Sequence, residues 1–107
     1  MSHKPTSTFV LQRASAVVLI PLALWFMWSL AAHAGEDFAG TSVWLSQLHN
    51  KAAFGLLVTI GVFHGRIGLN EIVEDYIHGG LNDVLKALTA LSSVAIAALT
   101  WWALVQI

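Results

Sequence analysis

The sequence predicts an all-α membrane protein with three transmembrane helices, and two observations support this. Of its 107 residues, 57% are hydrophobic and only 10% are charged, with a mean hydropathy of +0.73. A soluble domain carries about 25% charged residues, so a soluble helical bundle of this composition would lack the polar side chains to cover its surface. Residues 14–34 and 87–107 also form uncharged runs, each as long as the roughly 20 residues that a helix needs to cross a bilayer.

The first predicted helix covers residues 14–34. Lys4 and Arg13 precede it, and it ends in Ala32-His33-Ala34-Gly35, a sequence that also resembles a signal-peptide cleavage site. The apolar run is longer than a normal signal core. It also contains Pro21, which a membrane helix tolerates. We therefore expect a retained membrane helix.

The second predicted helix covers residues 44–69. The uncharged stretch between Lys51 and Arg66 is short for a span and would also suit a re-entrant segment. Extending the helix at both ends gives ample length, because the two cations can then reach opposite interfaces with their long side chains.

The third predicted helix covers residues 83–107. Asn82 or Asp83 can cap its free N–H groups, and a negative charge is favourable at a helix N-terminus. Together the three helices form a single predicted membrane-anchor domain over residues 1–107.

The basic residues predict the orientation. Four of the five lie at the N-terminus or in and around the second loop, and Lys51 is the exception; the four are Lys4, Arg13, Arg66 and Lys86. The positive-inside rule places that end of the bundle in the cytoplasm or the mitochondrial matrix. The net charge is −1 and the basic residues are scattered, so the sequence indicates a lipid bilayer and no nucleic acid as partner.

The chain has no cysteine and five histidines. It therefore offers no disulfide framework, no thiolate metal site and no covalent c-type haem attachment. His64 lies inside the second predicted span, whereas His33 and His49 lie toward the opposite face and His3 and His78 lie outside the apolar runs. His49 is 15 residues before His64, about 22 Å along a helix. One chain thus offers one intramembrane ligand to a metal.

Three glycines lie near His64 on one helical stripe, namely Gly61, Gly65 and Gly68. A groove without side chains beside an imidazole would let a flat porphyrin approach the backbone. The alternative is a Gly-x-x-x-Gly packing face with a hydrogen-bonded histidine, since small residues are common where membrane helices meet.

Asp75 and Tyr76 follow His64 after eleven and twelve residues, and we expect them in a short polar turn at the water interface. A tyrosine hydroxyl can donate a hydrogen bond to a quinone carbonyl. Tyr76 could instead be an interfacial tyrosine, and Asp75 a solvated residue or a helix cap. Glu71 and Glu74 are expected to be solvated.

These features resemble the small hydrophobic membrane-anchor protein of succinate dehydrogenase, respiratory complex II. The resemblance rests on His64-x10-Asp75-Tyr76, on the start of the first helix at Arg13-Ala-Ser15-Ala, and on the three spans. It implies that His64 is an axial ligand of haem b, that a partner membrane-anchor protein supplies the second ligand, and that Arg13 and Ser15 belong to the haem surroundings. Arg13 could also serve only as a positive-inside anchor. Arg66 lies about 200° around the helix from His64 and should point away from a haem.

The resemblance also implies a function. The chain would anchor the flavoprotein and the iron–sulfur protein of the complex in the membrane, with Tyr76 and Asp75 forming part of a ubiquinone site. It contains no nucleotide- or succinate-binding motif, so it would be a non-catalytic part of an oxidoreductase, expected in the bacterial inner membrane rather than the mitochondrial one. A cofactor-free structural membrane protein or assembly factor, and the anchor of a fumarate reductase, remain alternatives.

Overall fold

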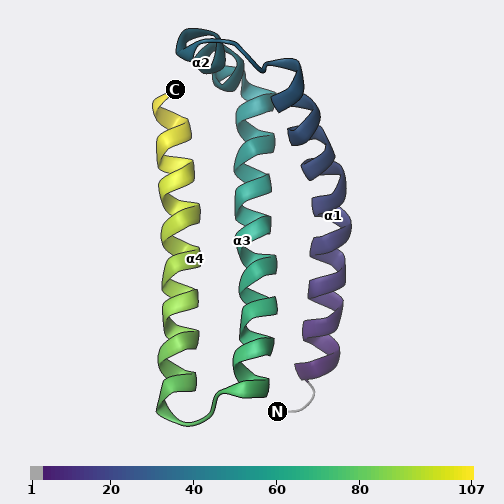
Figure 1. Ribbon diagram of the computed structural model, residues 1–107, viewed down its shortest axis with the longest axis vertical. Helices are drawn as coiled ribbons and strands as arrows, with labels where there is room; N and C mark the ends of the chain where they lie inside the picture. The colour runs from purple at the N-terminus through teal and green to yellow at the C-terminus, as the bar shows by residue number, and fades with distance from the viewer. Residues whose placement is uncertain (1–3) are drawn as a thin grey trace.

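The computed structural model describes the backbone of residues 4–107 and the side chains from residue 7 onward. Over this range, three long helices lie side by side in one layer: α1 (Lys4–Ala32), α3 (Leu48–Tyr76) and α4 (Gly80–Gln106), with α3 in the middle (Figure 1). A short helix, α2 (Phe38–Ser46), lies across one end. All three long helices have the length and composition of membrane spans. The predicted all-α membrane fold is confirmed.

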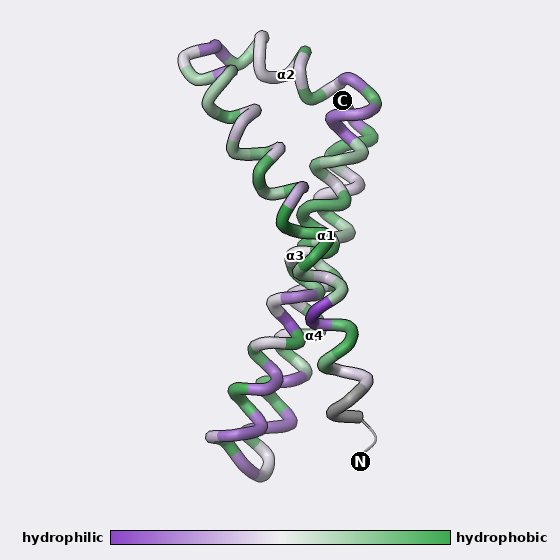
Figure 2. The backbone as a smooth tube through the Cα atoms, turned by 90° about the vertical axis from the view of Figure 1, so that its right-hand side faces the viewer, coloured by the Kyte–Doolittle hydropathy of each residue, from purple (hydrophilic) through white to green (hydrophobic). Residues whose placement is uncertain are grey.

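The layer has little core of its own. It measures 49 × 25 × 21 Å, and its long dimension compares with about 40–45 Å for a bilayer with its headgroups. α1 crosses α3 and α4 near mid-length, so its ends diverge from theirs (Figure 2). Among the described residues, Val73 and Leu104 are the buried hydrophobic side chains. The exposed apolar surface is therefore available to lipid and to partner chains.

The first connection differs from the prediction, because it contains a helix that the sequence analysis missed. α1 ends at Ala32, and Gly35 then adopts a φ of +91°, a left-handed conformation that suits glycine. Asp37 caps α2 by accepting a hydrogen bond from the Gly40 backbone N–H at 2.9 Å. The predicted helices, 14–34 and 44–69, left no helix in the connection between them, and this part of the prediction is wrong.

α3 begins at Leu48 rather than at residue 44. Gln47 is extended, with φ −66° and ψ 136°, and it separates α2 from α3. The buried side-chain amide of Asn50 stabilises the connection between the two helices. It donates hydrogen bonds to the Trp44 carbonyl at 2.9 Å and to Gln47 Oε1 at 3.1 Å. Trp44 therefore belongs to α2 and not to the second span.

α3 also ends later than predicted. It runs through Tyr76, so the expectation that Asp75 and Tyr76 lie in a turn is wrong. The extra turns are stabilised from α4, where the Asn82 side chain donates to the Ile77 carbonyl at 2.8 Å. Asn82 or Asp83 was expected to cap the third helix, but the Asn82 side chain caps the end of α3 instead.

The connection to α4 is correspondingly short. Gly79 has a φ of +74°, and α4 begins at Gly80, earlier than the predicted residue 83. Asp83 lies in the first turn of α4, where its charge suits the helix N-terminus. Lys86 pairs with Glu74 at 2.6 Å, so Glu74 links the two helices while its side chain stays exposed to solvent, as expected.

Packing between α3 and α4 centres on Trp101. Its indole N–H donates to Thr59 Oγ1 at 2.7 Å, and a Cβ on Gly55 would collide with its ring. Gly55→Ala should therefore displace the indole and destabilise the protein by about 1–3 kcal/mol, the usual cost of overpacking. The measurement is thermal unfolding of the purified protein in detergent. Gly80→Ala is the matched control, because a Cβ there meets nothing within 4 Å; equal stability of the two variants would contradict this packing.

The structure brings the N-terminal end of α1 and the α3–α4 connection to the same end of the bundle (Figure 1). His3 and the side chain of Lys4 lie outside the described residues. Because the chain has no cysteine, single cysteines can report the orientation. Ala39→Cys should react only with a membrane-impermeant thiol reagent on the periplasmic or intermembrane side, and His78→Cys only from the opposite side. The reversed labelling pattern would overturn the positive-inside assignment.

Candidate functional site

The candidate site is built around His64, on the middle helix. Its Nδ1 lies 2.8 Å from Ser15 Oγ of α1, in a contact that joins residues 49 positions apart. Ser15 is only 8% exposed, and its hydroxyl also donates to the Gln12 carbonyl at 3.0 Å. Within the described part of the chain, His64 Nε2 makes no hydrogen bond. One ring nitrogen is thus held by α1 while the other stays available.

The three glycines near His64 do not have the same surroundings. A Cβ on Gly61 would touch Leu19 of α1 at 4.0 Å, and one on Gly68 would lie 3.4 Å from Gln12 Nε2. Gly65 is exposed, and a Cβ there would meet nothing within 4 Å. Gly61 and Gly68 therefore face α1, where a Cβ would make ordinary van der Waals contact, whereas Gly65, about 100° around the helix from His64, leaves an open surface.

The arginines lie apart from this contact. The Arg13 guanidinium carbon lies 5.2 Å from the centroid of the Phe9 ring, on an exposed part of α1. The α1 residue that contacts His64 is Ser15, two positions later. Arg66 lies on the α4 side of α3, in the same angular sector as Thr59. Its Nε is buried and has no hydrogen-bond partner within the described residues.

Gln12 is a residue that the sequence analysis did not single out. Its carbonyl accepts the Ser15 hydroxyl proton, and its side-chain Oε1 is buried without a partner in the described chain. A signal for it existed, since it is a polar residue immediately before the apolar run and three positions before Ser15. Nearly all buried polar atoms bond to protein, water or a bound group. Gln12 Oε1 and Arg66 Nε therefore suit contacts with water, with another protein chain or with a bound group.

Tyr76 lies on a continuous exposed strip of α3 that starts beside His64. At 100° per residue, its four members fall within about 60° of one another. They are Gly65, Leu69 (53% exposed), Ile72 (55%) and Tyr76 (78%). Asp75 is exposed and lies about 20° from the direction of His64. The strip thus connects the open surface at Gly65 with the phenol at the end of α3.

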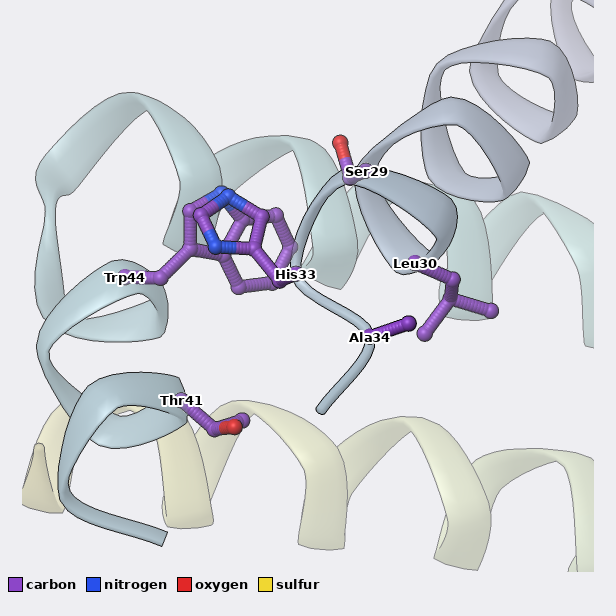
Figure 3. A pocket seen from close by; sticks show the side chains of 6 residues that line it. All are labelled: Ser29, Leu30, His33, Ala34, Thr41 and Trp44. Carbon is purple, nitrogen blue, oxygen red and sulfur yellow. The ribbon is translucent and has the colours of Figure 1, made fainter. Parts of the chain in front are cut away.

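His33 and His49 are far from this site. His33 lies near α2 at the opposite end, where its Nδ1 is 3.0 Å from Glu36 Oε2 and its ring packs against Trp44 with a centroid separation of 5.3 Å. Figure 3 shows this region, a shallow hollow of about 150 Å³ lined by Ser29, Leu30, His33, Ala34, Thr41 and Trp44. His49 is exposed in the first turn of α3.

The side chains that could bind a metal restrict the kind of metal group that the chain can hold. The described residues contain no cluster of three or more His, Cys, Asp or Glu side chains that could bind a bare ion. His64 can contribute one ligand through Nε2, next to the open surface at Gly65. This fits a metal whose remaining ligands come from a porphyrin and from a partner chain. It does not fit a free ion held by the described residues alone.

The sequence also matches a known family along almost its whole length. Residues 1–105 match the model of the succinate dehydrogenase/fumarate reductase transmembrane subunit. The chain belongs to this family.

Two relatives of the family agree with the assignment. A succinate dehydrogenase membrane anchor subunit of Reclinomonas americana is 32% identical over 72 residues, which cover 64% of this chain and 60% of the relative. A succinate dehydrogenase hydrophobic membrane anchor subunit of Rickettsia conorii is 26% identical over 70 residues, 64% of this chain and 56% of the relative. The aligned segments thus span less than two thirds of these relatives. No solved structure matches the chain significantly.

Proposed function

We propose that this chain is the small membrane anchor of a succinate:ubiquinone oxidoreductase. In this role it binds a partner membrane-anchor protein, and the pair holds the iron–sulfur protein and the flavoprotein at the membrane. Its compartment is the bacterial cytoplasmic membrane. The observation that carries the proposal is the exposed strip of α3 from Gly65 to Tyr76, which joins the His64 surroundings to a phenol at the end of the helix that the positive-inside rule places toward the catalytic proteins.

His64 is the residue that would hold a haem b, through its free Nε2. When bound, such a haem would exchange single electrons, and it would be of the non-covalently held b type because the chain has no cysteine to attach it. Gly65 provides space for a flat ring against the backbone, and the partner membrane anchor supplies the second imidazole. Gln12 Oε1 is buried without a partner in the described chain, beside the Ser15–His64 contact, and so suits a contact at the edge of the group. The buried Arg66 Nε lies on the α4 side of α3, away from His64, and suits a contact with the partner anchor. Arg13 remains a candidate for contact with the propionates, because its long side chain can turn from Phe9.

Tyr76 and Asp75 would form this chain's part of the ubiquinone site. The Tyr76 hydroxyl donates a hydrogen bond to one quinone carbonyl and orients the ring, while the isoprenoid tail stays against the exposed apolar strip. Reduction to the quinol takes two electrons from the iron–sulfur protein and two protons from water. Asp75 lies exposed at the end of α3, where it can pass protons between water and the ring oxygens.

The test is purification of the complex through an affinity tag on this chain. The proposal expects a flavoprotein and an iron–sulfur protein to co-purify, with succinate-dependent reduction of a ubiquinone analogue. A tagged chain that purifies without either protein would indicate an assembly factor. A complex that reduces fumarate with a quinol much faster than it oxidises succinate would indicate a fumarate reductase anchor.

A further inference from the structure

Ser15 can make two hydrogen bonds, and it has only one proton to give. Its oxygen lies 3.0 Å from the Gln12 carbonyl oxygen and 2.8 Å from His64 Nδ1. If the hydroxyl donates to the carbonyl, it must accept from an Nδ1–H group. If it donates to Nδ1 instead, the bond to Gln12 is lost, and the ring proton moves to Nε2. The first arrangement makes two hydrogen bonds and the second makes one.

We infer that Ser15 is a positioning residue for His64, whose hydroxyl oxygen accepts the Nδ1 proton and so leaves Nε2 with a free lone pair. This inference deepens the proposed haem function and rests on it. A metal-binding histidine commonly donates its other ring N–H to a nearby acceptor, which fixes the tautomer and ring orientation and makes the ligand more basic. Ser15 supplies that acceptor from α1, in a buried position.

The predicted electronic effect has a definite sign. An acceptor on Nδ1–H raises the electron density at Nε2, and a more basic ligand stabilises ferric over ferrous iron. Removing the acceptor should therefore raise the midpoint potential of the haem and shift the g values of its ferric signal. Loss of a partner behind a metal ligand typically weakens metal binding about 10- to 100-fold, so haem retention during purification should fall on that scale.

The experiment compares four variants of the purified complex by potentiometric titration and electron paramagnetic resonance. Ser15→Ala removes the acceptor. Ser15→Cys keeps a similar side-chain volume, but its thiol is a weak hydrogen-bond acceptor. If the Ser15→Ala complex does not assemble, the midpoint potential and g values of the Ser15→Cys complex test the inference. Ser15→Thr keeps the hydroxyl. Ser29→Ala is the matched control, because Ser29 is on a similar face of α1, equally buried at 7% exposed against 8%, and remote from His64.

Support for the inference is a raised potential and shifted g values in Ser15→Ala and Ser15→Cys, with wild-type values in Ser15→Thr and Ser29→Ala. Wild-type potential and g values in both Ser15→Ala and Ser15→Cys would overturn it, as would an equal shift in Ser29→Ala. If the proposed haem function itself is wrong, the experiment gives a different result. In that case the wild-type complex contains no haem, or the His64→Ala complex keeps haem with an unchanged signal.

Discussion

Replacing His64 with alanine is expected to remove the b-type haem spectrum from the purified complex. Within the described residues, His64 offers a free imidazole nitrogen inside a membrane span, and its partner Ser15 engages only the other nitrogen. Alanine offers no ligand, so haem should be lost, or should remain through a substitute ligand with a changed paramagnetic signature. The measurement is the reduced-minus-oxidised absorption spectrum combined with electron paramagnetic resonance.

His49→Ala is the matched control, since His49 is on the same helix but exposed in its first turn. His33→Ala is a second control, because His33 pairs with Glu36 near α2. Both should retain the wild-type spectrum. An absorption spectrum and resonance signal that are unchanged in His64→Ala would contradict the assignment of the axial ligand.

Replacing Tyr76 with phenylalanine is expected to lower quinone reduction by about ten- to a hundredfold. The variant keeps the ring and deletes the hydroxyl. A hydrogen bond to a partly charged group contributes about 1.5–3 kcal/mol, and each 1.36 kcal/mol changes a rate about tenfold. Succinate oxidation with a soluble dye, which takes electrons directly from the catalytic proteins, should be unaffected, and haem content should be unchanged.

The control for Tyr76 is Trp102→Phe, which also removes the polar group of an exposed aromatic side chain (63% exposed) but lies in the last turns of α4, at the opposite end of the bundle. It should keep both activities. If Tyr76→Phe lowers the dye and quinone activities together, Tyr76 contributes to assembly. If it lowers neither, Tyr76 is an interfacial tyrosine, and the quinone site belongs to the partner proteins.

The membrane fold could be predicted from the sequence because it depends on local composition. The uncharged runs indicated the number of spans, and three consecutive spans joined by short connections place the N-terminus and the second loop at the same end. The orientation that the basic residues predict stays a prediction. Helix ends were less accurate. α3 continues through Asp75 and Tyr76 because the Asn82 side chain caps it from the next helix, a contact that no local pattern reveals. α2 was missed although Asp37, which caps it, is a recognisable signal.

In the candidate site, too, some features could be predicted from the sequence and others could not. His64 could be found because a histidine within a span is unusual, and Tyr76 because of its spacing from that histidine. The contact between Ser15 and His64 could not, since it joins two helices across 49 residues. Periodicity placed all three glycines on one stripe, but only the packing of α1 distinguishes Gly65, which is open, from Gly61 and Gly68. The roles of these residues in haem and quinone binding remain proposals.

The most direct test of the haem-binding role is the dithionite-reduced minus oxidised absorption spectrum of the wild-type complex, purified through a tag on this chain. We expect a b-type haem band in a preparation that also contains flavin and iron–sulfur centres and reduces ubiquinone with succinate. An active complex of these proteins without a haem band would contradict that role, and would leave this chain as a cofactor-free anchor.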